Sequence, residues 1–135
     1  MRELTVEANT KSIPTIIDLI NEELDQLGCS PKSKAQIDIA VDEVFSNIAN
    51  YAYGEEDGQV TVRLEAENNG QVVNLVFLDK GMPFNPLEHD DPNVLLPARE
   101  RRSGGLGIYI VKNSMDEIRY EYKDGKNILT IRKTL

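Results

Sequence analysis

The sequence lacks the features of several common protein classes. It contains one cysteine, Cys29, so an internal disulfide is excluded, and no basic partner that would activate the thiol is visible beside it. No apolar run approaches the roughly 18 residues of a membrane span, and the first residues do not resemble a signal peptide. We therefore expect a protein of the reducing cytoplasm that does not associate with membranes.

Positive charge is also scarce. The chain has 15 Lys and Arg against 23 Asp and Glu, a formal net charge of −8. This balance argues against direct nucleic-acid binding, which needs clustered positive charge. The exception is a group of three arginines within four residues, Arg99, Arg101 and Arg102. Taken alone, this group is typical of a solvated loop.

No repeat, low-complexity tract or flexible linker divides the sequence. Hydrophobic residues make up 40% and charged residues 28% of the 135 positions, which is ordinary for a folded protein. Because domains commonly hold about 100–150 residues, we expect residues 1–135 to form a single domain with its own core.

Hydrophobic periodicity predicts the order of the helices and strands. Two segments carry apolar residues at helical spacing, and two turns, Asn68-Asn69-Gly70 and Asp124-Gly125, predict hairpins. The fold expected from this order is α/β (α+β): a two-layer α/β sandwich whose largely antiparallel mixed sheet is covered on one face by helices. The predicted elements are a strand at 2–8, helices at 10–27 and 32–51, strands at 59–67 and 71–78, an irregular loop at 79–103, a helix at 108–115, and strands at 117–122 and 127–133.

Three local features could carry chemistry, and the first is the pair Glu43 and Asn47. Their i, i+4 spacing on the second helix puts the side chains about 5–6 Å apart on one face. A carboxylate can accept a proton from an attacking hydroxyl, and an amide oxygen suits magnesium, which takes few protein ligands. The alternative is the solvated face of an amphipathic helix.

The second feature is the segment Asp79-Lys80-Gly81-Met82-Pro83-Phe84, which follows a predicted strand. An aspartate at the end of a strand can accept a hydrogen bond from an exocyclic amine such as that of adenine. Gly81 has no Cβ, so a ligand or another backbone can come close to it. A plain turn is the alternative, because Asp, Gly and Pro are common turn residues.

The third feature is Ser103-Gly104-Gly105-Leu106-Gly107, which leads into a helix. Glycines here expose backbone N–H groups at a helix N-terminus, where the helix dipole favours anions, and the arginines upstream would add positive charge for phosphate. The segment matches neither the Walker A loop nor the dinucleotide-binding fingerprint. A flexible hinge before the helix is the alternative.

In this order the three features resemble the N, G1 and G2 boxes of the GHKL (Bergerat-fold, histidine-kinase-like) ATPase superfamily. Within it, the chain is most similar to the anti-sigma-factor serine/threonine-protein kinases, and the resemblance covers nearly the whole chain. One position departs from the pattern, since relatives commonly carry a histidine where this chain has Tyr51. The segments that carry the resemblance are 40–53, 79–86, 104–108 and 115–117.

The resemblance implies a protein that uses ATP and Mg²⁺. Glu43 would be the general base and Asn47 the magnesium ligand. Asp79 would recognise adenine in a pocket shaped by Gly81, and an ATP lid would span about 86–103. The further nucleotide-binding residues that the resemblance implies are Arg101, Arg102, Gly104, Gly105, Leu106 and Gly107.

The resemblance also implies protein partners. The substrate would be a STAS-domain anti-sigma-factor antagonist, a sigma factor would be sequestered, and many members are homodimers. No helix here bears a phosphoacceptor histidine, since the only histidine, His89, lies in the lid region, so an intact sensor kinase is excluded. An excised catalytic domain of such a kinase is not excluded by the motifs. Two alternatives stay open: a nucleotide-binding regulatory module that binds its partner without phosphoryl transfer, and a structural domain without a ligand.

Overall fold

The structure is a computed structural model that describes residues 1–53, 58–88 and 105–135. Within these residues the strands and α-helices follow one another in the predicted order. The elements are β1 (Arg2–Glu7), η1 (Thr10–Ser12), α1 (Ile13–Gln26), α2 (Pro31–Asn47), η2 (Ile48–Ala52), β2 (Gln59–Glu67), β3 (Val72–Asp79), η3 (Pro86–Glu88), α3 (Gly105–Ser114), β4 (Glu117–Lys123) and β5 (Lys126–Thr134).

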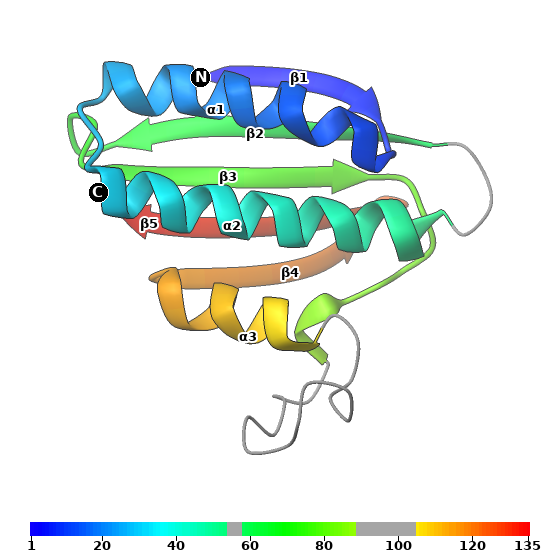
Figure 1. Ribbon diagram of the computed structural model, residues 1–135. Helices are drawn as coiled ribbons and strands as arrows, with labels where there is room; N and C mark the ends of the chain where they lie inside the picture. Colours follow the sequence, from blue (N-terminus) through cyan, green and yellow to red (C-terminus); the bar gives the residue numbers. More distant parts are fainter. Residues whose placement is uncertain (54–57, 89–104) are drawn as a thin grey trace.

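The strands form one sheet in the order β1-β2-β3-β5-β4. Every neighbouring pair among the described strands is antiparallel, so this sheet has no parallel pair and is not mixed. The three α-helices lie side by side on one face of the sheet, as Figure 1 shows. The predicted two-layer α/β sandwich is therefore confirmed, with a simpler sheet than expected.

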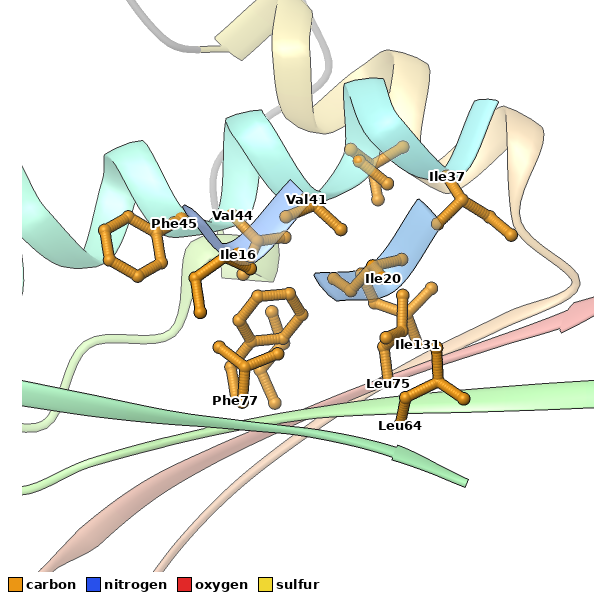
Figure 2. Close-up of a cluster of buried hydrophobic side chains, with 14 of the residues drawn as sticks. Ile16, Ile20, Ile37, Val41, Val44, Phe45, Leu64, Leu75, Phe77 and Ile131 are labelled. Carbon is orange, nitrogen blue, oxygen red and sulfur yellow. The ribbon is translucent and has the colours of Figure 1, made fainter. Parts of the chain in front are cut away.

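The core lies between the helices and the sheet. Alternate residues of the strands point toward the helices, as the two-residue period of a strand requires. In Figure 2 the side chains of Ile16 of α1 and Val44 of α2 lie close above Phe77 of β3, between the helices and the sheet. The largest fully buried side chains are Phe45, Phe77, Ile16, Ile20, Leu24, Ile37, Leu75, Ile131, Val41, Val44, Val60 and Val62.

The predicted turns are confirmed by backbone conformation. Asn68, Asn69 and Gly70 have φ values of 52°, 59° and 86°, and Asp124 and Gly125 have φ values of 55° and 76°. Positive φ at two successive residues suits the tight turn of a hairpin, and Asn, Asp and Gly tolerate it best. The two turns join β2 to β3 and β4 to β5, and thereby set the register of both hairpins.

The second helix differs from its predicted form at its C-terminal end. We expected one helix through Tyr51, but the α-helix ends at Asn47 and continues as the π-helix η2. A π-helix is wider than an α-helix and is often found at functional sites. Here it leaves Tyr51 exposed and buries Ala52.

Most of the predicted lid, residues 89–103, lies outside the described residues, and its start forms the short 3-10 helix η3. Across the described ranges, no helix is both long and apolar enough to span a membrane.

Candidate functional site

Glu43 and Asn47 lie together on α2, where Asn47 is buried and Glu43 is half-buried. Asn47 is 7% exposed, and its Nδ2 donates a hydrogen bond to Oε1 of Glu43 at 3.4 Å. Burial raises the pKa of Glu43 above its ordinary value of 4.5, and the amide of Asn47 offsets part of this effect. The pair is therefore not an ordinary solvated helix face, because such a face would not bury an amide.

Gly107, which belongs to the glycine segment, lies against the side chain of Glu43. It lies in the first turn of α3, and a Cβ added to it would overlap the carboxyl group of Glu43. The carboxylate therefore packs directly on the Gly107 backbone. The first N–H groups of a helix have no partner within the helix, and the dipole at this end favours anions. A carboxylate, a glycine and a helix N-terminus thus meet at one place.

Asp79 is the last residue of β3 and is 4% exposed. Its Oδ1 accepts hydrogen bonds from the N–H of Gly81 and from Nδ2 of Asn127, both at 2.9 Å. Burial raises the pKa of Asp79 above 3.8, and these two hydrogen bonds act against that rise. Among the described residues, no hydrogen bond reaches Oδ2, so this oxygen can accept one from a ligand.

Asn127 on β5 joins Asp79 to the chain that follows it. Besides Asp79, its Nδ2 donates to the carbonyl of Met82 at 2.8 Å. Its Oδ1 accepts from the N–H of Phe84 at 3.1 Å and from the hydroxyl of Tyr120. With 4% of its surface exposed, Asn127 is a buried anchor for the 80–84 segment.

Sequence reasoning missed Asn127, although one signal was present. Asn127, Leu129 and Ile131 share the helix-facing side of β5 and are all buried. Asparagine is disfavoured in strands, so its presence in an otherwise apolar series indicates a specific polar contact.

The other side of the same segment is fixed by the end of η2. The N–H of Met82 donates to the carbonyl of Ala52 at 2.8 Å, and a Cβ added to Gly81 would overlap that carbonyl. The hydroxyl of Tyr53 accepts from the N–H of Lys80 at 2.9 Å. Two backbones therefore approach closely at Gly81, which is the kind of contact expected of a residue without a Cβ.

A small cavity connects the two parts of the site. Its lining joins the end of α2 and η2 to β3, β5 and the segment after Asp79, and it is mostly apolar with a few polar groups, as ligand sites commonly are. Its volume is about 20 Å³, which is enough for one water molecule. The lining residues are Val44, Asn47, Ile48, Ala52, Phe77, Asp79, Phe84, Pro86, Tyr120, Asn127 and Leu129.

A larger hollow of about 610 Å³ borders the other face of the sheet. Thr5, Thr61 and Arg63, which line it, point away from the helices, and Asp79 is the one predicted site residue on its border. It is open and polar, and neither the α2 pair nor α3 contributes to it. We therefore place the candidate site at the smaller cavity, where the predicted residues converge.

The remaining predicted residues divide into two groups. Gly105, Leu106 and Gly107 open α3, as the sequence predicted. Arg101, Arg102 and Gly104 lie outside the described residues.

Cys29 is half-buried, and burial raises the pKa of its thiol. A raised pKa disfavours the thiolate, which is the reactive form. This agrees with the absence of an activating basic partner beside Cys29 in the sequence.

The comparison with known families agrees with the fold. Residues 6–133 match the family described as "Histidine kinase-like ATPase domain", and the chain belongs to this family. The chain is also similar to particular curated proteins and to particular solved structures.

Among curated proteins, the chain is similar to serine-protein kinases named RsbW. The protein of Listeria innocua serovar 6a is 29% identical over 110 residues, which cover 76% of this chain and 67% of that protein. The protein of Bacillus mycoides is 23% identical over 136 aligned positions, covering 94% of this chain and 81% of that protein.

Among solved structures, the chain is similar to the RsbU and RsbW domains of Rv1364c from Mycobacterium tuberculosis. The TM-score is 0.65 at 16% identity, and the match covers all of this chain and 33% of that one. A histidine kinase domain from Erythrobacter litoralis EL346 gives a TM-score of 0.59 at 17% identity, covering 93% of this chain and 60% of that one. Both likenesses establish a shared fold.

Proposed function

We propose that this protein is an ATP-dependent serine/threonine kinase and anti-sigma factor. It transfers the γ-phosphoryl group of ATP to a hydroxyl of a STAS-type anti-sigma-factor antagonist and sequesters a sigma factor. The observation that carries the proposal is the contact of Glu43 with Gly107 at the start of α3, beside a cavity that Asn47 and Asp79 share. Relatives that bear the name serine-protein kinase support the reaction type.

The purine end of the nucleotide belongs at Asp79. Oδ1 is held by Gly81 and Asn127, so the carboxylate is fixed in one orientation with Oδ2 available. An oxygen fixed in this way can accept a hydrogen bond from the exocyclic amine of adenine. The apolar lining around it suits the faces of a purine ring.

The phosphate end belongs at the start of α3. Backbone N–H groups in the first turn, including that of Gly107, offer donors to phosphate oxygens. Asn47 fits a magnesium site: its Nδ2 is turned to Glu43, so its Oδ1 is the atom left for a cation. One protein oxygen is sufficient, because magnesium keeps several waters and takes phosphate oxygens. When bound, the ion would neutralise charge on those phosphate oxygens.

Glu43 is the proposed general base. In the transfer step a partner's serine or threonine oxygen bonds to the γ-phosphorus, the bond from that phosphorus to the ADP oxygen breaks, and the hydroxyl proton passes to the Glu43 carboxylate. The raised pKa of Glu43 strengthens it as a proton acceptor near neutral pH. Most of the rate enhancement would come from positioning and charge neutralisation.

We further propose that the domain, its lid and its oligomeric state follow the pattern of the family. Residues 1–135 would act as one ATPase domain with a lid at about 86–103, in a cytoplasmic homodimer. Arg101, Arg102 and Gly104 would contact the phosphates from that lid.

The test is transfer of label from γ-labelled ATP to a purified STAS-domain protein. We expect wild type to label the partner and Glu43→Ala to lose at least about two orders of magnitude in rate, the usual contribution of a general base. Asp42→Ala is the matched control, because Asp42 is the neighbouring but exposed carboxylate of the same helix. Thermal shifts with Mg-ATP measure binding separately, since a ligand that binds the folded state must stabilise it.

The outcomes separate the hypotheses. If Glu43→Ala transfers label as fast as wild type, the base assignment is wrong. If wild type binds nucleotide and partner without labelling, the protein is a nucleotide-binding regulatory module. If nucleotide gives no thermal shift, the ATPase proposal is wrong as a whole.

A further inference from the structure

The cavity that Asn47 and Asp79 share is too small for a purine. A volume of about 20 Å³ holds one water molecule, whereas pockets for small-molecule ligands span hundreds of Å³. Binding therefore requires part of the cavity wall to move.

One segment of the wall lies between β3 and the end of η3 rather than in the helix–sheet sandwich. Most of the wall's residues belong to α2, η2, β3, β4 and β5, whose side chains pack into the core or into the hydrogen-bond network of Asn127. Phe84 and Pro86 instead belong to the chain between β3 and the end of η3. The N–H of Phe84 donates to Asn127, so turning the Phe84 side chain would enlarge the cavity without breaking that hydrogen bond.

Tyr51 holds this side chain from outside the cavity. Its ring stacks on that of Phe84 with 5.3 Å between the ring centroids and 29° between the planes. Tyr51 is 45% exposed and does not line the cavity itself. Within η2, Ala52 faces inward while Tyr51 lies at the surface beside the 81–84 segment.

We propose that Tyr51 is a positioning residue that keeps Phe84 over the purine cavity, and that their stack must open before a purine nucleotide binds. This inference rests on the proposed nucleotide site and adds a control of access to it. The apparent dissociation constant then equals the intrinsic constant divided by the fraction of molecules in which Phe84 has moved away. Removal of the Tyr51 ring raises that fraction and tightens binding.

The proposal predicts the direction in which affinity for Mg-ATP changes when the Tyr51 ring is removed. Aromatic stacks contribute an amount that corresponds to about 2- to 10-fold in an equilibrium constant, so Tyr51→Ala should bind Mg-ATP about 2- to 10-fold more tightly than wild type. The gain should lie in the association rate, because the bound state, with Phe84 turned away, lacks the stack in both proteins. A residue with a purely structural role would give the opposite result, weaker binding together with a lower Tm.

The experiment is stopped-flow and equilibrium titration with a fluorescent ATP analogue in Mg²⁺ buffer. Tyr51→Phe keeps an aromatic ring and should match wild type. Ile39→Ala is the control for loss of an exposed apolar side chain on α2, and it should leave both rates unchanged.

Tighter and faster binding by Tyr51→Ala alone supports the inference. Equal or weaker binding by Tyr51→Ala, or faster association by Tyr51→Phe or Ile39→Ala as well, overturns it while the proposed function stands. Absence of binding by wild type refutes the proposed function and this inference together.

Discussion

Asn127 offers the most demanding test of the site, because Asn127→Asp changes its chemistry without changing its shape. The two acceptor contacts, from the N–H of Phe84 and the hydroxyl of Tyr120, can persist. The two donor contacts, to Asp79 and to the carbonyl of Met82, are lost, because a carboxylate cannot donate. A second carboxylate would also lie about 3 Å from Oδ1 of Asp79, the present Nδ2–Oδ1 distance being 2.9 Å.

The magnitude follows from these contacts. A hydrogen bond to a charged group contributes about 1.5–3 kcal/mol and a neutral one about 0.5–1.5 kcal/mol, so the lost donors cost about 2–4 kcal/mol before any repulsion. For a chain of this length that free energy lowers Tm by roughly 6–16 °C. Two carboxylates this close cannot both ionise freely, so the folded pair would retain a proton with a pKa above that of Asp79 alone.

The assay is thermal unfolding of wild type and variant between pH 4 and pH 8. A group whose pKa is raised by folding adds stability below its unfolded pKa, and this stability is lost as pH rises through the folded pKa. The loss of thermal stability in Asn127→Asp relative to wild type should therefore be smallest near pH 4 and grow toward neutral pH. Mg-ATP binding should weaken at neutral pH, since Asp79 and the 80–84 segment lose their anchor.

Asn74→Asp is the matched control. Asn74 is also a buried asparagine that donates to a carboxylate, Glu67, at 2.8 Å. Glu67 keeps its hydrogen bond to Arg132 and is exposed, so this substitution should lower Tm less than Asn127→Asp does and leave nucleotide binding intact. Equal effects of both substitutions, or a deficit of Asn127→Asp that does not vary with pH, would refute the assigned contacts.

Three further predictions concern residues of the same site. Gly107→Ala puts a methyl group where the Glu43 carboxylate lies and displaces that carboxylate, so label transfer should fall at least about tenfold with little change in stability, because the end of a flexible side chain can move aside; unchanged transfer in the labelling assay would contradict the contact. Gly81→Ala overlaps the backbone carbonyl of Ala52, which cannot move aside as a side chain can; we expect a loss of about 1–3 kcal/mol in urea unfolding, and a neutral result would show that the approach is looser. Glu43→Gln removes a carboxylate whose pKa is raised by burial, so Tm should rise at pH 7.5 and match wild type well below pH 4.5; a gain that is the same at both pH values would exclude burial of the charge as its cause.

The elements that the sequence predicted well are those set by neighbours along the chain. Positive φ at Asn69-Gly70 and Asp124-Gly125 is a local property, and it determines which strands pair. The start of the second helix was predicted within one residue, and it lies where Ser30 caps the helix by accepting a hydrogen bond from the N–H of Ser33 at 3.2 Å. Local rules of this kind can be read from one sequence without knowledge of the fold.

The contacts that the sequence did not predict join residues far apart along the chain. Asn127 contacts Asp79 across 48 positions, and no local pattern pairs a strand asparagine with one particular carboxylate. The contact of Glu43 with Gly107 depends on how α3 packs on α2, which periodicity does not specify. The π-helix is a third case, since the apolar pattern of α2 continues past Asn47 without a break.

The two sides of the cavity differ in how firmly they are held, and this difference bears on function. Asp79 is fixed through Gly81 and Asn127, so its orientation costs no reorganisation when a ligand binds. Phe84 is fixed at its backbone, but its ring is held by a half-exposed tyrosine. The part of the proposed site that recognises the purine is therefore rigid, and the part that controls access to it can move. A substitution at Tyr51 can then change how fast nucleotide binds without changing which nucleotide is recognised, whereas a substitution at Asn127 changes both.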